Sequence, residues 1–163
     1  MKFVLFRHAH KGVSPYDDPE LSQQGFEQAS QILEMIKNAK IPEPTHLFVS
    51  PRRRTSQTFY PVSKEFNLLT QIRPELDQRN SQESSADFRK RISNLFTLLE
   101  DINTPNAVVF ACTHFDWIEE AMTLINSDKD LNSFEFSYWS PAQYIVFEKE
   151  ADLWILQTKG TVK

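Results

Sequence analysis

Phe3-Val4-Leu5-Phe6-Arg7-His8 is the stretch that decides the fold, because four apolar residues run directly into an arginine and a histidine. A short, nearly continuous apolar run is typical of a strand that is buried on both faces of a parallel sheet. Two similar runs occur at residues 47–49 and 107–111. Together the three runs predict the central strands of a parallel sheet.

Segments with helical periodicity separate these runs. In residues 24–39, five apolar side chains fall on one face of a helix, which predicts the first crossover helix. Further helices are predicted at residues 51–66, 87–99 and 116–125. Strands that alternate with helices in this way indicate an α/β fold.

The C-terminal part of the chain has a different pattern. Two apolar runs, at residues 144–147 and 153–156, flank a polar turn at residues 149–152, which predicts a β-hairpin. The fold class predicted from the whole chain is therefore a three-layer α/β/α sandwich. Its central sheet is expected to be mostly parallel, with the antiparallel hairpin at the C-terminal edge.

Length and composition indicate one packed domain that spans residues 1–163. Apolar residues make up 40% of the chain and charged residues 25%, as in globular proteins. The formal net charge of −4 argues against nucleic acid as a partner. Cys112 is the only cysteine, so no intrachain disulfide can form. Since neither a signal peptide nor a run of membrane-spanning length is recognisable, we expect a cytoplasmic protein without a membrane partner.

Polar residues follow the three predicted central strands at the point where each ends. Arg7-His8 follows the first run, Ser50-Pro51-Arg52-Arg53-Arg54 the second, and Thr113-His114 the third. Because parallel sheets bind ligands beyond the carboxyl ends of their strands, we expect these side chains to meet at one edge. A single His or Arg at such a position is most often a surface group, but their joint placement indicates a functional site.

The residue types favour phosphate as the ligand of this site. Arginine offers planar, paired donors that match phosphate oxygens, and the helix expected after Ser50 adds backbone donors at its N-terminus. A neutral imidazole can attack phosphorus and form a covalent phosphohistidine, which divides hydrolysis into two easier steps. A second imidazole can stabilise the negative oxygens of the transition state. The sequence therefore predicts an anion site with a histidine nucleophile.

Five motifs along nearly the whole chain resemble those of the histidine phosphatase superfamily, which is also called phosphoglycerate mutase-like. They are Phe6-Arg7-His8-Ala9, Asp18-Pro19-Glu20-Leu21-Ser22-Gln23-Gln24-Gly25-Phe26-Glu27-Gln28-Ala29, Ser50-Pro51-Arg52-Arg53-Arg54-Thr55-Ser56-Gln57-Thr58, Glu83-Ser84 followed by Phe88 and Arg91, and Cys112-Thr113-His114-Phe115. The resemblance implies a phosphoglycerate mutase-like fold. The chain departs from the usual motifs at Gln82 and Phe115, where glycine is common.

The resemblance also assigns roles to individual residues. It implies that His8 is the nucleophile and that Arg7, Arg54 and His114 surround the phosphoryl group. In this register Arg52 and Arg53, which stand next to Arg54, have no family role. The resemblance implies neither a metal nor any other cofactor.

The third-strand motif departs from the family at the position where many members carry a glutamate that protonates the leaving group. That register gives Leu76-Asp77-Gln78 here, and an amide cannot act as a general acid. Gln78 is therefore predicted to hold the substrate by hydrogen bonds. Asp77, Glu83 and Asp116 are the nearby candidates for the acid, and Glu83 is favoured because it lies in a family motif. The alternative is that no strong acid is needed, which suits a good leaving group such as the nitrogen of a phosphohistidine or a phosphoanhydride.

The rim of the site is expected to be open. Residues 78–83 form a short segment where sugar-phosphate mutases have a longer capping insertion, and an open site is compatible with a protein substrate. His10 and Lys11 follow the nucleophile and are candidates for contact with a second anionic group. We assign Lys11 and Thr113, together with Gln78, to substrate binding.

The sequence therefore predicts a metal-independent phosphatase that forms a phosphohistidine on His8 and hydrolyses phosphoric monoesters or phosphoramidates. Its partner is expected to be a phosphoprotein, with phosphohistidine as the modified residue, or a phosphorylated small molecule. Two alternatives stay open: a non-catalytic phosphate-binding or scaffolding domain of the same fold, and a phosphoglycerate mutase-like phosphotransferase. A nucleotide-binding fold is excluded because no glycine-rich loop follows the first strand.

Overall fold

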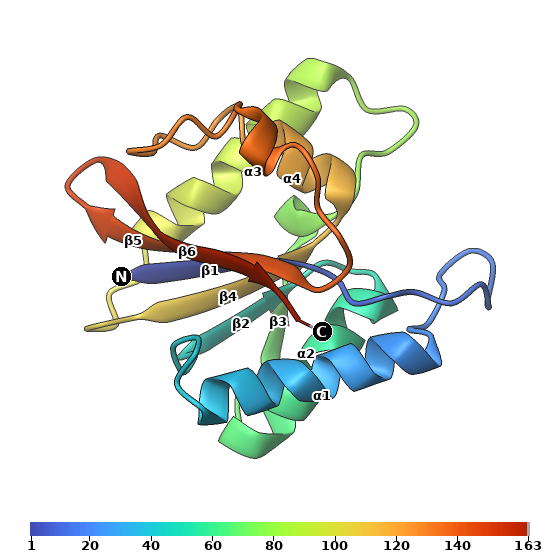
Figure 1. The fold of residues 1–163 in the computed structure, drawn as a ribbon. Coiled ribbons are helices and arrows are strands. Elements are labelled where there is room, and N and C mark those ends of the chain that lie inside the picture. The colour runs from blue at the N-terminus through green and yellow to red at the C-terminus, as the bar shows by residue number, and fades with distance from the viewer. Residues whose placement is uncertain (163) are drawn as a thin grey trace.

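A computed structural model describes residues 1–162 of the chain. These residues form a six-stranded sheet with the strand order β3-β2-β4-β1-β5-β6 (Figure 1). The three apolar runs predicted as central strands are β1, β2 and β4, and they are neighbours in the sheet. The strands are β1 (Lys2–Arg7), β2 (His46–Val49), β3 (Thr70–Ile72), β4 (Val108–Thr113), β5 (Gln143–Glu150) and β6 (Leu153–Thr161).

Strand directions confirm the predicted mixed sheet. The strands β1, β2, β3 and β4 are parallel, whereas β5 is antiparallel to both of its neighbours, β1 and β6. The register pairs Arg7 at the end of β1 with Thr113 at the end of β4. The residues that follow these two strands therefore leave the sheet side by side at the same edge.

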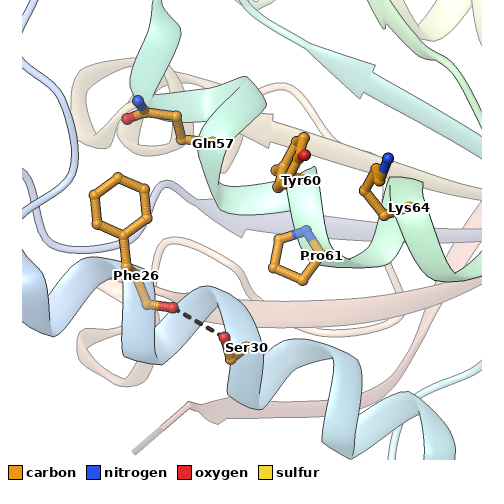
Figure 2. Close-up of a pocket in the computed structure, with 6 residues that line it drawn as sticks. All are labelled: Phe26, Ser30, Gln57, Tyr60, Pro61 and Lys64. Carbon is orange, nitrogen blue, oxygen red and sulfur yellow. Dashed lines mark hydrogen bonds between the residues drawn. The ribbon is translucent and has the colours of Figure 1, made fainter.

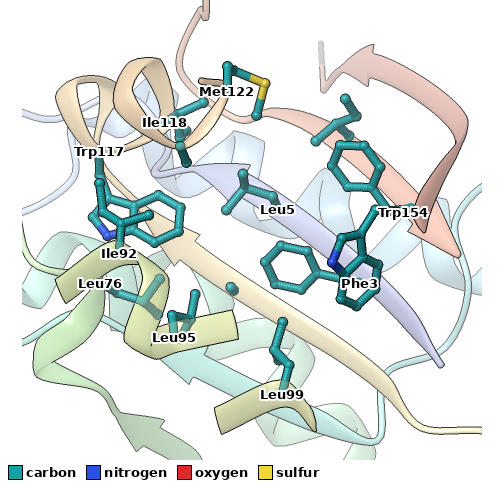
Figure 3. Packing of buried hydrophobic residues seen from close by; sticks show 14 of the residues in the cluster. Phe3, Leu5, Leu76, Ile92, Leu95, Leu99, Trp117, Ile118, Met122 and Trp154 are labelled. Carbon is teal, nitrogen blue, oxygen red and sulfur yellow. The ribbon is translucent and has the colours of Figure 1, made fainter. Parts of the chain in front are cut away.

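In the described residues 1–162, four α-helices cover the two faces of the sheet, and none is long and apolar enough to cross a membrane. The helices α1 (Gln23–Lys37) and α2 (Arg53–Phe66) lie on one face, and α3 (Ser85–Glu100) and α4 (Phe115–Ala121) lie on the other (Figure 1). Each face has its own cluster of buried apolar side chains. Figure 3 shows the cluster on the α3 and α4 side, which contains Leu5, Leu95 and Trp117. This is the predicted three-layer sandwich.

The segment after β3 differs from the sequence-based expectation. The family register places Leu76 at the end of the third strand, but β3 ends at Ile72 and Leu76 belongs to a short 3₁₀ helix, η1 (Pro74–Leu76). Pro74 has no N–H to donate to a neighbouring strand, and its ring holds φ near a helical value, so the chain leaves the sheet at this point. Gln78 therefore approaches the edge of the sheet from a turn.

The helix predicted at residues 116–125 is shorter than expected. It corresponds to α4, which contains seven residues and ends at Ala121. Beyond it, the N–H groups of Thr123 and Leu124 donate to carbonyls three residues earlier, at Glu120 and Ala121. This tighter 3₁₀ pattern is common where a helix ends.

The connection between β1 and α1 packs closely against the first turn of the helix. Ser22 caps α1 by accepting a hydrogen bond from the N–H of Gly25 at 3.1 Å. A Cβ atom at Gly25 would lie 2.0 Å from the carbonyl oxygen of His10, so only glycine allows this approach. The glycine of the second motif therefore holds the loop that follows the proposed nucleophile.

Candidate active site

The predicted meeting of polar side chains at one sheet edge is present in the structure. His8 follows β1, His114 follows β4, and Arg54 lies in the first turn of α2, which follows β2. All three side chains are buried, and the ring centroids of His8 and His114 are 5.4 Å apart. The two imidazoles and the guanidinium thus form one cluster, although they come from three distant segments of the chain.

The hydrogen bonds of His8 define which of its two ring nitrogens carries the proton. Its Nδ1 donates to the carbonyl oxygen of Ala9 at 2.7 Å, so Nε2 carries the free lone pair. Arg54 Nε donates to this Nε2 at 3.3 Å. Burial, followed by the positive charges of Arg54 and Arg7, lowers the pKa of His8 to about 3, although the hydrogen bond to Ala9 acts in the opposite direction. His8 is therefore neutral near pH 7, and its Nε2 can act as a nucleophile.

His114 is the second neutral imidazole of the cluster. Arg54 Nη2 lies 3.1 Å from its Nδ1, and because a guanidinium only donates, this nitrogen is the acceptor. The other ring nitrogen, Nε2, donates to the hydroxyl of buried Ser50 at 2.8 Å. Burial and the charge of Arg54 lower the pKa of His114 to about 2. Its Nδ1 faces the same space as Nε2 of His8.

Arg54 presents one edge of its guanidinium to the site. Its Nε contacts His8, and its Nη2 contacts His114 and also donates to the side-chain oxygen of Gln78 at 2.7 Å. These two nitrogens form the edge that binds phosphate with two parallel hydrogen bonds. An incoming phosphate would replace contacts that Arg54 now makes with the protein.

Arg7 has an unused donor at the same edge of the sheet. Its Nη1 donates to the carbonyl oxygen of Trp139, and its guanidinium lies over the ring of Phe115 at 5.5 Å from the centroid. Its Nε is buried and has no hydrogen-bond partner in the structure. Since a buried donor without a partner is costly, this nitrogen is suited to receive an anionic ligand.

Gln78 and Lys11, the residues that the sequence assigns to substrate binding, lie near the cluster. The side-chain oxygen of Gln78 is held by Arg54, which turns the amide toward the cluster. Lys11 is exposed, and its charge contributes to the lowered pKa of both His8 and His114. These two residues therefore belong to the rim of the site.

Glu83 is not placed as a general acid, contrary to our expectation. Its two carboxylate oxygens accept from Arg91, with Nε at 2.9 Å and Nη2 at 2.8 Å. This paired hydrogen bond lowers the pKa of Glu83, so the group stays ionised and cannot readily supply a proton. Arg91 also donates to the carbonyl oxygens of Asp77 and Gln78. The pair thus holds the segment that carries Gln78.

The other two candidate acids also have partners. Asp77 forms an ion pair with Arg52, in which Nε and Oδ1 are 2.9 Å apart. Asp116 accepts from two backbone N–H groups at the start of α4 and in the neighbouring turn, those of Trp117 and Arg79. Both carboxylates are therefore engaged in structural contacts.

Thr113 has a positioning role instead of the predicted contact with substrate. Its side chain is fully buried, and its hydroxyl donates to the carbonyl oxygen of Leu76 at 2.6 Å. Its carbonyl oxygen accepts from the N–H of His8 at 3.0 Å. Thr113 thus links the end of β4 to both the nucleophile segment and η1.

Three residues of the site were not assigned from the sequence. Ser50 orients His114, and Thr58 accepts from the N–H of Ala9 at 3.0 Å while it donates to the carbonyl of Arg54 at 2.7 Å. Both belong to the second-strand motif, so the motif itself was the available signal. Asp18, which contacts the start of α2, is the first residue of the motif at residues 18–29, but the motif gave it no role.

The structure also has an open hollow of about 650 Å³ between α1 and α2 (Figure 2). None of its lining residues belongs to the histidine and arginine cluster. Gln57, one of them, accepts from the backbone N–H of Leu21 and thereby ties α2 to the loop that precedes α1. The lining residues are Phe26, Ser30, Gln57, Tyr60, Pro61 and Lys64.

A metal site is not evident in the described part of the chain. Among residues 1–162, no group of three or more His, Cys, Asp or Glu side chains is arranged to hold a metal ion. The positive charges around the two imidazoles instead favour an anion.

The family model of the histidine phosphatase superfamily (branch 1) matches residues 3–83, the half of the chain that carries His8 and Arg54. Together with the fold, this match shows that the chain belongs to the histidine phosphatase superfamily. No curated protein matches the chain.

Solved structures of phosphatases share the fold over almost the whole chain. The protein histidine phosphatase SixA complexed with tungstate has a TM-score of 0.74 at 15% identity, over 99% of this chain and 97% of that one. Mycobacterial glucosyl-3-phosphoglycerate phosphatase complexed with VO3 has a TM-score of 0.75 at 16% identity, over 98% and 99%. A mutant of phosphoserine phosphatase from Entamoeba histolytica in complex with phosphoserine has a TM-score of 0.74 at 14% identity, over 99% and 98%. At these identities the similarity concerns the fold.

Proposed function

We propose that this chain is a metal-independent phosphatase that acts through a phosphohistidine intermediate on His8. The observation that carries the proposal is the hydrogen bond from Nδ1 of His8 to the Ala9 carbonyl, which leaves Nε2 unprotonated and facing Arg54. A site for binding alone would need the arginines but not a bare, neutral imidazole nitrogen. This feature favours catalysis over the non-catalytic alternative.

The first chemical step forms a bond between Nε2 of His8 and phosphorus, while the bond from phosphorus to the leaving atom breaks. Arg54 and Arg7 bind the phosphoryl oxygens with the donors described above. The incoming negative charge favours a proton on Nδ1 of His114, which then donates to a phosphoryl oxygen. In the second step, a water oxygen attacks phosphorus while the bond to Nε2 of His8 breaks; inorganic phosphate leaves with the protons of the water, and neutral His8 is restored.

The substrate is proposed to carry a good leaving group. Gln78 stands at the position of the usual acid, and the three neighbouring carboxylates are held by structural contacts. Without a general acid, negative charge builds up on the leaving atom, so phosphoramidates and aryl esters should react better than alkyl esters. The phosphohistidine of a protein meets this requirement, and the exposed rim would admit it. Small phosphorylated molecules with comparable leaving groups are the second source.

A turnover assay in the presence of a chelator tests the proposal. We expect the protein with excess EDTA to release nitrophenol from p-nitrophenyl phosphate and phosphate from a phosphohistidine peptide, because the chemistry depends on protein side chains. Calorimetry with tungstate measures binding at the same site. Tight binding of tungstate without turnover of either substrate would favour the non-catalytic domain. Loss of turnover with EDTA that returns with added metal would contradict the proposed mechanism.

Gln78→Glu is expected to change the preference for leaving groups. A carboxyl group at this position can protonate a departing oxygen, so the ratio of alkyl to aryl phosphate turnover should rise at least about tenfold. The two rates are measured with a series of phosphate esters that differ in the pKa of the leaving group. Gln82→Glu makes the same chemical change at an exposed position of the same loop and should leave the ratio within about twofold.

Two results, one from the wild-type protein and one from the Gln78→Glu variant, would contradict the proposed absence of a general acid. If it already hydrolyses alkyl phosphates as fast as aryl phosphates, another residue donates the proton and Gln78 does not mark a missing acid. If folded Gln78→Glu gains nothing on alkyl phosphates, residue 78 is not in reach of the leaving group.

A further inference from the structure

Asp18 lies in the connection between β1 and α1, and its carboxylate contacts the start of α2. Both carboxylate oxygens accept from the backbone N–H of Arg53, at 3.3 and 3.4 Å. The side chain of Arg53 approaches the same carboxylate, with Nε 3.5 Å from Oδ2. Asp18 thus contacts the residue immediately before Arg54.

The same carboxylate also approaches the guanidinium of Arg54. Oδ1 of Asp18 is 3.8 Å from Nη1 of Arg54, and the Arg54 side chain is almost completely buried. The other two guanidinium nitrogens, Nε and Nη2, face His8, His114 and Gln78. Asp18 therefore stands behind the guanidinium, on the side opposite the phosphate-binding edge.

The start of α2 lacks a cap of its own. Its N-cap residue, Arg52, makes no side-chain hydrogen bond to the helix, so the first N–H groups need partners from elsewhere. The carboxylate of Asp18 provides one and also complements the positive end of the helix dipole. One side chain thus contacts both the backbone that carries Arg54 and its charged head group.

The loop that carries Asp18 is fixed at its base. The N–H of Gly12 donates to the carbonyl of Glu20 at 2.7 Å, and the N–H of Ser22 donates to that of His10 at 2.9 Å. Glu20 adds an ion pair with Arg53, with Oε1 3.3 Å from Nη1. These contacts lie between His8 and α1, so the loop connects the nucleophile to the helix that carries Arg54.

We propose that Asp18 is a positioning residue that holds the guanidinium of Arg54 with its Nε and Nη2 edge toward the phosphoryl group. Arginine has several rotatable bonds, and a fixed orientation improves a paired hydrogen bond to phosphate. The inference rests on the proposed function, since it concerns how that site binds its anion. Asp18 acts through Arg54 and does not itself contact the substrate.

An electrostatic effect of Asp18 and a positioning role predict opposite changes in anion binding when its charge is removed. A carboxylate near an anion site repels the anion, so removal of its charge should strengthen anion binding if Asp18 only contributes to the electrostatic field. If Asp18 orients Arg54, its removal should weaken anion binding and slow the reaction. The sign of the change therefore separates the two explanations.

The experiment compares Asp18→Asn with two matched controls. Asp17→Asn removes the same charge from an exposed neighbour, and Glu20→Gln removes the other ion pair of Arg53 without touching Arg54. We expect Asp18→Asn to lower kcat/KM on p-nitrophenyl phosphate by about 10- to 30-fold, mainly through kcat, and to weaken tungstate binding several-fold. Both controls should remain within about twofold of the wild type. Thermal unfolding is measured for every variant.

A double-mutant cycle with Arg54→Lys gives the decisive comparison. Lysine keeps the charge but not the planar fork, so Asp18→Asn should add little to the loss that Arg54→Lys already causes. An equal loss in both backgrounds would show that Asp18 supports only the loop, and tighter tungstate binding by Asp18→Asn would show an effect of charge; either result overturns the proposal. Tungstate binding tests Asp18 even if the wild-type protein hydrolyses nothing, so failure of this inference can be told apart from failure of the proposed function.

Discussion

His8→Asn is expected to reduce turnover of p-nitrophenyl phosphate by on the order of 10³-fold or more, because His8 is proposed to supply the nitrogen that forms the covalent intermediate. Asparagine retains a polar side chain of moderate size at this buried position, so the fold should persist. The site otherwise keeps its arginines, and tungstate should still bind. Steady-state kinetics and calorimetry on the same preparation separate the loss of chemistry from a loss of binding.

Trapping of the intermediate distinguishes the two buried histidines. Rapid quenching of the wild-type protein should give a phosphorylated species that is labile in acid and stable in alkali, as expected for phosphohistidine. The intermediate should be absent from His8→Asn and still form, more slowly, in His114→Gln. His10→Ala is the control for a nearby exposed imidazole. A phosphoenzyme in folded His8→Asn would transfer the nucleophile role to another residue.

Arg54→Ala is expected to cost on the order of 2 to 4 kcal/mol of transition-state stabilisation, which is a loss of roughly 30- to 1,000-fold in kcat/KM. The guanidinium contacts His8, His114 and Gln78, so its removal affects both the anion and the groups around it. Tungstate affinity and kcat should therefore fall together. Kinetics with p-nitrophenyl phosphate and tungstate calorimetry measure the two effects.

The neighbouring arginines provide matched controls for Arg54. Arg52 pairs with Asp77, and Arg53 pairs with Asp18 and Glu20, all in partly exposed positions. Such pairs contribute about 1 kcal/mol or less, so Arg52→Ala and Arg53→Ala should each lower kcat/KM by no more than about fivefold. An effect as large as that of Arg54→Ala at either position would contradict the register of the second-strand motif.

The meeting of His8, Arg54 and His114 could be predicted because it follows from strand order and direction. Each residue stands near the C-terminal end of a strand whose apolar run is visible in the sequence, and parallel strands bring those ends to one edge. The antiparallel hairpin at the C-terminal end of the chain could also be predicted from its apolar runs. Two apolar runs with a short polar turn have one obvious way to pair.

The general acid could not be predicted in the same way. Asp77, Glu83 and Asp116 are all close to the site in sequence, and nothing in their order shows which oxygens have partners. The structure pairs Glu83 with Arg91, eight residues later on the first turns of α3, and thereby leaves it ionised. Side-chain contacts of this kind depend on how turns fold, which hydrophobic periodicity does not describe.

Apolar runs, helical periodicity and the polar residues at strand ends determined the layered fold and the histidine and arginine cluster, since these patterns repeat along the backbone and act locally. Tertiary structure alone decided which nitrogen of His8 is free, because the choice depends on a hydrogen bond to the Ala9 carbonyl and on burial by distant segments. It also decided that Thr113 holds η1 rather than the substrate. The position of Asp18 behind Arg54 has the same origin, because it joins residues 36 apart through the packing of a loop on a helix end, and such contacts leave no period in the sequence.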